Sequence, residues 1–110
     1  MRAALLALLL MAGSAEAAQR VYEGDEAAAL RCANMMALTG VMLNRAGLMG
    51  EQEKDVLIGI SVLILERHVG GTWAQKKRAM ETMRGRRDVD ATLLDYQRNA
   101  PRCLRRFPIN

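Results

Sequence analysis

Two cysteines and one histidine are the residues of this 110-residue chain that could support thiol chemistry or histidine-assisted nucleophilic catalysis. Cys32 and Cys103 are the only thiols, and His68 is the only histidine. Thiol redox catalysis uses a Cys-x-x-Cys pair or a neighbour that stabilises the thiolate, and hydrolysis needs a histidine paired with a nucleophile. The two cysteines lie far apart in the sequence, and no residue near His68 indicates a nucleophile. We therefore predict no enzymatic activity and no catalytic residues.

The methionines and His68 offer a second kind of chemistry, the binding of copper or haem. Thioether groups suit Cu(I), and Met35 and Met42 are spaced so that they share one face of a helix. Haem would need two axial ligands that face each other, and the attachment signature Cys-x-x-Cys-His is absent. Methionine is also a common core residue where aromatic residues are few, and here they make up 4%. We expect no metal and no cofactor, with copper or haem binding by His68, Met35 and Met42 as an alternative.

The first 17 residues have the pattern of a secretory signal peptide. Arg2 gives a positive start, residues 3–12 are apolar (AALLALLLMA), and Ala15-Glu16-Ala17 fits the small-x-small cleavage rule. A helix of this apolar length spans about 15 Å, half of a bilayer core of roughly 30 Å. We expect export to the periplasm, or secretion, and no transmembrane span after signal removal; an interfacial N-terminal helix is the alternative.

Export would place the two cysteines in a compartment where disulfides form and persist. We predict a structural disulfide between Cys32 and Cys103, with a reactive thiol or an intermolecular bridge as the alternatives. In the chain-entropy model, a bridge across so long a loop stabilises a domain by roughly 4 kcal/mol. Residues 18–110 are long enough for one domain.

Four helical segments are predicted in residues 18–110, and no strand. Thr72 and Gln75 form a capping-box pattern, and the residue before Pro101 disfavours the helical conformation. The predicted fold is all-α, a small bundle of about four helices closed by the disulfide, either antiparallel or orthogonal. The expected helices cover about residues 25–45, 50–69 and 73–84, and a last segment from Asp88 or Asp90 that ends before Pro101.

The first two segments are apolar on nearly every side. The last two segments have few apolar residues with which to cover them. The run 56–65 (VLIGISVLIL) could be a strand, but its charged flanks extend it to helical length, and it is too short for a membrane span. Either both helices are central and wrapped, or part of their surface is an interface with a partner protein or a second copy. The candidate interface residues are Met35, Met36, Met42 and Leu43, with Ile58, Ile60 and Ile64 on the second helix.

Basic residues gather in the second half of the chain. Residues 67–110 carry 11 basic and 4 acidic side chains, whereas residues 18–66 carry 4 basic and 7 acidic ones. A positive charge of this density favours the binding of anions. Because an exported protein seldom meets nucleic acid, we expect no nucleic-acid partner. The alternatives are a solvated surface and an anionic envelope component such as lipid or lipopolysaccharide. The candidate anion-binding residues are Lys76, Lys77, Arg78, Arg84, Arg86 and Arg87.

These features together predict a small exported helical protein with a non-catalytic binding or accessory role. Its expected partner is a protein, or a second copy, that contacts the apolar helix faces. Binding of envelope anions and binding of copper or haem are the alternatives.

Overall fold

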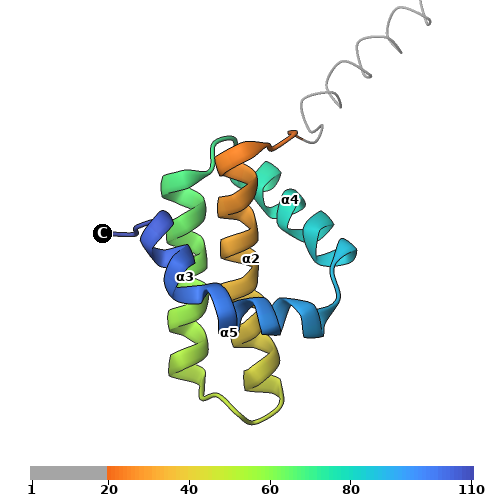
Figure 1. Cartoon of the computed structure of the whole chain (residues 1–110), viewed down its shortest axis with the longest axis vertical. Helices are drawn as coiled ribbons and strands as arrows, with labels where there is room; N and C mark the ends of the chain where they lie inside the picture. The colour runs from red at the N-terminus through yellow and green to blue at the C-terminus, as the bar shows by residue number, and fades with distance from the viewer. Residues whose placement is uncertain (1–19) are drawn as a thin grey trace, which may run out of the picture.

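A computed structural model describes residues 20–110 of the chain, and the predicted signal peptide, residues 1–17, lies outside this range. Residues 20–110 form four helices and no strand (Figure 1). The predicted all-α fold is therefore confirmed, and most helix ends lie within two residues of their predicted positions. The helices are α2 (Gly24–Arg45), α3 (Glu51–His68), α4 (Trp73–Arg86) and α5 (Val89–Arg106).

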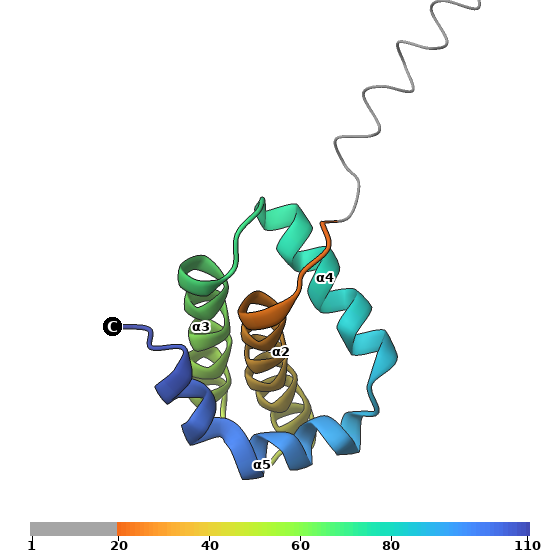
Figure 2. The same ribbon diagram turned by 45° about the horizontal axis from the view of Figure 1, so that its top comes forward.

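The helix α2 is the centre of the bundle. It packs against α3, α4 and α5, and Figure 2 shows these three helices arranged around it. Because α2 has neighbours on several sides, its apolar residues are buried on several sides as well, including Leu30, Met36 and Leu38. The hypothesis of a wrapped central pair is thus right for α2 and wrong for α3, which lies at the edge of the bundle (Figures 1 and 2).

The turn 46–50 joins α2 to α3, and the two helices run antiparallel with a close approach near this turn (Figure 1). A Cβ atom added to Gly40 would lie 3.2 Å from the Cβ atom of Leu57. Glycine at this position therefore lets the two backbones approach. The rest of the core extends from this contact toward Ile64, Val69 and Phe107, at the other end of the hairpin.

The last helix differs from its prediction, because α5 does not end before Pro101 but runs through it to Arg106. Proline removes one backbone donor and disfavours the helical conformation of the residue before it, which is a local cost. Tertiary contacts offset this cost: Cys103 is bonded to α2, and Phe107, directly after the helix, is 6% exposed. Proline inside a helix commonly bends it, and α5 changes direction along its length (Figure 2).

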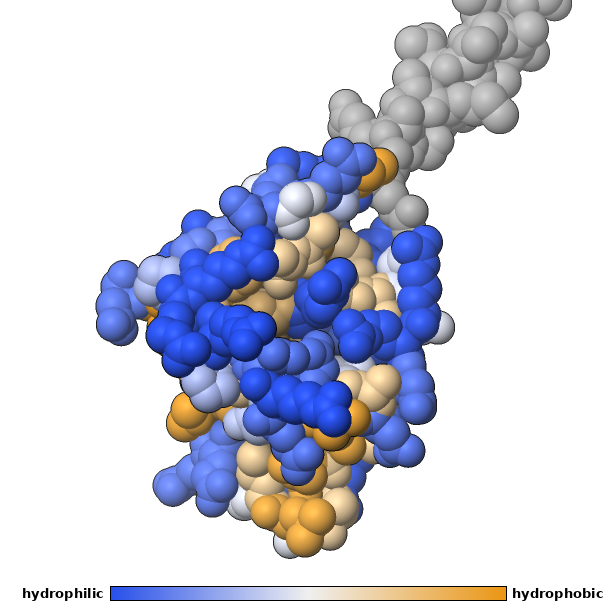
Figure 3. Space-filling view, in the orientation of Figure 1, coloured by the Kyte–Doolittle hydropathy of each residue, from blue (hydrophilic) through white to orange (hydrophobic). Residues whose placement is uncertain are grey.

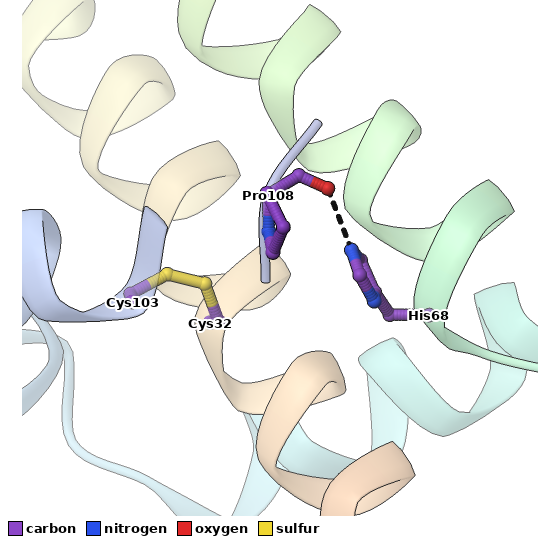
Figure 4. Close-up of a disulfide and its surroundings, with 4 residues drawn as sticks. All are labelled: Cys32, His68, Cys103 and Pro108. Atoms are coloured by element: carbon purple, nitrogen blue, oxygen red, sulfur yellow. Dashed lines mark hydrogen bonds between the residues drawn. A yellow bond between two sulfur atoms is a disulfide. The ribbon is translucent and has the colours of Figure 1, made fainter. Parts of the chain in front are cut away.

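The predicted disulfide between Cys32 and Cys103 is confirmed. It joins α2 to the last turns of α5 across 71 residues, with 5.8 Å between the two Cα atoms (Figure 4). Both cysteines are buried in the core. The bridge therefore closes the bundle by fixing its last helix to its central one.

Within residues 20–110, no single helix combines the length and the apolar content that a membrane span requires. The helices α3 and α4 reach that level only as a pair bent by 119°.

Candidate functional site

One long face of α3 is not covered by any other helix of the described chain. The helix buries only Leu57, Ser61, Ile64 and Leu65, although its residues 56–65 are almost entirely aliphatic. The side chain of Val56 is 60% exposed, and a Cβ atom added to Gly59 would meet nothing within 4 Å. The two apolar helices therefore differ in burial, since α2 is enclosed and α3 is covered on one side only.

The uncovered face of α3 has a regular pattern. Val56, Gly59, Ile60 and Leu63 follow each other at steps of three and four residues, which places them in one stripe along the helix. Ile60 is half-buried at the edge of the stripe, where it also packs against the core. Leu63 is half-buried at the far end of the stripe, and Gly59 leaves a shallow point about midway along its length. In the sequence and spacing of its residues, the stripe is typical of a surface that packs against another helix.

Charged residues border this stripe. At 100° per residue, Asp55 and Glu66 lie along one side of the stripe and Glu53 along the other, whereas Arg67 lies in line with the stripe, one turn beyond Leu63. All four are exposed. The border therefore has three negative charges, and the one positive charge stands at the end of the stripe.

The apolar surface continues onto the turn between α2 and α3. Leu48 in this turn is 77% exposed, and the neighbouring Met42 and Leu43 at the end of α2 are half-buried. Figure 3 shows apolar atoms at this end of the molecule, beyond the band of hydrophilic atoms that covers its middle. Two of the four predicted interface residues thus lie at a partly open surface.

The other two predicted interface residues are not on the surface. Met35 is 3% exposed and Met36 is 1% exposed, because the helices around α2 cover this part of it. Both belong to the core, so the prediction that they contact a partner is wrong. Ile64, considered with them in the sequence, is also fully buried.

The predicted basic cluster is divided between different environments. The ammonium group of Lys76 is directed inward and donates to the carbonyl oxygen of Leu65 at 3.0 Å. Lys76 is therefore not available to bind an anion at the surface. Arg84 donates to the side chain of Asn34 at 3.4 Å. Lys77 and Arg78 are exposed on α4. The remaining two, Arg86 and Arg87, line a cavity.

This cavity has a volume of about 410 Å³ and lies between the segment before α2, α2 itself and α4. Its cationic wall consists of Arg86 and Arg87 together with Arg20 and Arg31. The last two belong to the half of the chain with excess acid, so the charge distribution along the sequence did not reveal them. They reach the same cavity because α4 packs beside the start of α2 (Figure 2).

The wall formed by the segment before α2 is fixed to the turn between α3 and α4. The hydroxyl of Tyr22 donates to the carbonyl oxygen of Gly70 at 2.8 Å, and the backbone N–H of Gly70 donates to Glu26 at 2.6 Å. Gly71 has a φ of +90°, and a Cβ atom added there would lie 2.7 Å from the Tyr22 hydroxyl. Glycine is required at this position, both for the backbone conformation and for the space that Tyr22 occupies.

His68 and Met42, two of the three residues considered for copper or haem, lie far apart. The Nε2 atom of His68 is 2.8 Å from the carbonyl oxygen of Pro108 (Figure 4). The His68 ring also packs edge-on against Phe107. Gly40 lies beside Leu57, about 16 Å along the axis of α3 from His68, and Met42 lies beyond Gly40 toward the turn. Residues 20–110 contain no group of three or more His, Cys, Asp or Glu side chains placed to bind a metal.

Comparison with known proteins identified no relative of this chain. Neither a protein-family model, nor a curated protein, nor a solved structure matches the chain. The function is therefore inferred from the surfaces of this chain alone.

Proposed function

We propose that the protein is a non-catalytic binding module of the bacterial periplasm, and that it binds an amphipathic helix of a partner protein along the outer face of α3. The observation that carries the proposal is the uncovered stripe of Val56, Gly59, Ile60 and Leu63 on the most aliphatic helix of the bundle. An exposed apolar surface bordered by polar residues is typical of a protein interaction site. The predicted signal peptide and the disulfide support the periplasm as the compartment.

The shape of the stripe favours a helix as the partner element. Helices pack by fitting side-chain ridges into grooves at steps of three and four residues, which is the spacing of this stripe. Gly59 has no side chain midway along the stripe, on its side toward Asp55 and Glu66, so a partner helix can approach closely there. The excess of Glu53, Asp55 and Glu66 along the border favours a partner whose apolar face is bordered by Lys or Arg.

The same acidic border disfavours two other occupants of the stripe, a second copy of this chain and an anionic membrane surface. In a symmetric antiparallel pair of α3 helices, each border meets its own copy, so Asp55 of one copy would lie near Glu66 of the other. An anionic membrane surface would also repel these carboxylates. A partner protein with a basic border removes both conflicts.

A photo-crosslinking residue at position 59 tests the proposal in the cell that makes the protein. The expected product is a crosslink to one partner, within a segment of amphipathic helix that has Lys or Arg beside its apolar residues. The matched control carries the same crosslinker at Leu94, an apolar residue of α5 that is 44% exposed, and should not give this product.

Affinity measurements with the crosslinked partner segment then distinguish the contribution of the apolar stripe to binding from that of its acidic border. Val56→Asp should weaken binding by at least about tenfold, because burial of a valine contributes roughly 1.5 kcal/mol. Glu53→Lys should weaken it less and reduce its dependence on salt. A crosslink from position 59 to a second copy or to lipid would contradict the proposal, as would binding that Val56→Asp leaves unchanged.

A further inference from the structure

We infer that the cavity beside α4 binds an amphiphile that has an anionic head group, a carboxylate or a phosphate monoester, and an aliphatic body. This site is separate from the outer face of α3 and does not depend on the function proposed for that face. Four arginine side chains from three parts of the fold line the cavity: Arg20, Arg31, Arg86 and Arg87. Their guanidinium groups match the geometry of carboxylate and phosphate oxygens.

Two of the four arginines have their charge already compensated. Arg20 is 3.2 Å from Glu26 and stacks over the ring of Tyr22, and Arg87 is 3.8 Å from Asp95. These contacts hold the two side chains in place at the edge of the cavity.

The other two arginines, Arg31 and Arg86, have no acidic side chain within 4 Å among residues 20–110. No aspartate or glutamate of the described chain lines the cavity. A concave site lined by charges of one sign raises the local concentration of the opposite ion. The head group of the ligand is therefore expected beside Arg31 and Arg86.

The rest of the lining is apolar, which separates this site from a site for a free anion. Leu30 is 2% exposed at the base of the cavity, and Ala27, Ala79 and Met83 contribute further apolar atoms. A volume of about 410 Å³ lies within the range of small-molecule pockets, roughly 300–1,000 Å³. Inorganic phosphate would leave most of this surface unused, whereas an aliphatic chain would cover it.

Isothermal titration of the protein, purified after expression of the full chain, tests both parts of the ligand. The probes are dodecanoate, dodecyl phosphate, dodecanol and inorganic phosphate, with the first two below their micelle-forming concentrations and dodecanol below its solubility limit. We expect one equivalent of dodecanoate or dodecyl phosphate to bind, with at least about tenfold weaker binding of dodecanol and of inorganic phosphate. The stronger of the two anionic probes identifies the preferred head group.

Two matched variants locate the binding site. Arg31→Gln together with Arg86→Gln should weaken binding of the anionic probes by about tenfold or more, since each lost arginine removes a charge-assisted hydrogen bond. Arg98→Gln together with Arg105→Gln lowers the net charge equally at exposed positions outside the cavity and should leave binding unchanged. Ala79→Phe fills the apolar part and should weaken the amphiphiles without affecting inorganic phosphate. Circular dichroism melting confirms that each variant is folded.

Several results would overturn the inference. Equal binding of dodecanol and dodecanoate would remove the role of the arginines. Equal binding of inorganic phosphate and dodecyl phosphate would indicate a site for a free anion. An equal loss in both double arginine variants would mean that net charge, not the cavity, attracts the probes, and no binding of any probe would exclude the site.

Discussion

The ammonium nitrogen of Lys76 lies 3.0 Å from the carbonyl oxygen of Leu65 and is buried with it. Leu65 belongs to the last turn of α3, where the backbone carbonyl groups carry partial negative charge. Lys76 stands on α4, so one side chain connects the end of one helix to the start of the next. This contact explains how the charged end of a lysine can be buried between α3 and α4.

Lys76→Met is expected to lower the free energy of unfolding by about 1 kcal/mol, because it keeps the aliphatic stem and removes the hydrogen bond. The loss is moderate because the Leu65 carbonyl also accepts from the backbone N–H of Val69 at 3.2 Å. Urea unfolding followed by circular dichroism measures the change. Lys77→Met, at an exposed neighbour, is the control, and equal midpoints for the two variants would show that the buried contact contributes nothing.

The disulfide is expected to supply a large part of the stability. Replacing Cys32 and Cys103 together by serine opens a loop of 71 residues and should lower the free energy of unfolding by roughly 4 kcal/mol in the chain-entropy model. Urea unfolding with and without a reductant measures this effect. The double variant should not respond to the reductant, and an unmodified protein whose midpoint ignores complete reduction would contradict the expectation.

Thr39 is expected to be a position at which stability can be gained. Its hydroxyl oxygen is buried in α2, with no hydrogen-bond partner among residues 20–110. Thr39→Val replaces this hydroxyl by a methyl group of similar size and should raise the free energy of unfolding by about 1 kcal/mol. Thermal melting measures it, with Thr39→Ser, which keeps the hydroxyl and loses the methyl, expected to melt lower. A valine variant less stable than the parent would show that the hydroxyl has a partner.

The first turn of α3 is expected to respond to pH. Lys54 donates to a carboxylate oxygen of Glu51 at 2.6 Å, and this hydrogen bond, with the attraction of opposite charges, lowers the pKa of Glu51 and raises the pKa of Lys54. Because the pKa of Glu51 is lower in the folded state, the stabilisation is complete at neutral pH and is lost as the pH falls through that lowered value. At high pH, it is lost again as Lys54 deprotonates above its ordinary pKa of 10.5.

An NMR titration of the Glu51 carboxyl carbon checks this expectation. In Lys54→Met the pKa of Glu51 should rise, because both the hydrogen bond and the positive charge are gone. Addition of salt should reduce the difference between the two proteins, since the pair is at the surface. An unchanged midpoint in the variant would contradict the assignment of the shift to Lys54.

Local signals in the sequence predicted the helices well, and they failed where tertiary contacts outweighed them. The capping box is present as predicted, with Gln75 N–H donating to the Thr72 hydroxyl and Thr72 N–H donating to the Gln75 side chain. These bonds join neighbouring residues, so the sequence alone can indicate them. Pro101 was a wrong stop signal, because Cys103 and Phe107 are anchored in the core and keep the last turn of α5 in place.

The sequence by itself determined the helical class and the number of helices within residues 20–110, because both follow from residue types and short-range spacing. It also determined the cysteine pairing, because the chain has only two cysteines. It did not determine which of the two apolar helices would be enclosed. Met36 and Val56 are both apolar residues on apolar helices, yet Met36 is 1% exposed and Val56 is 60% exposed. The difference arises because α4 and α5 pack against α2 and leave one face of α3 uncovered. The same packing brings Arg31 and Arg86 to one cavity, although they stand on different helices.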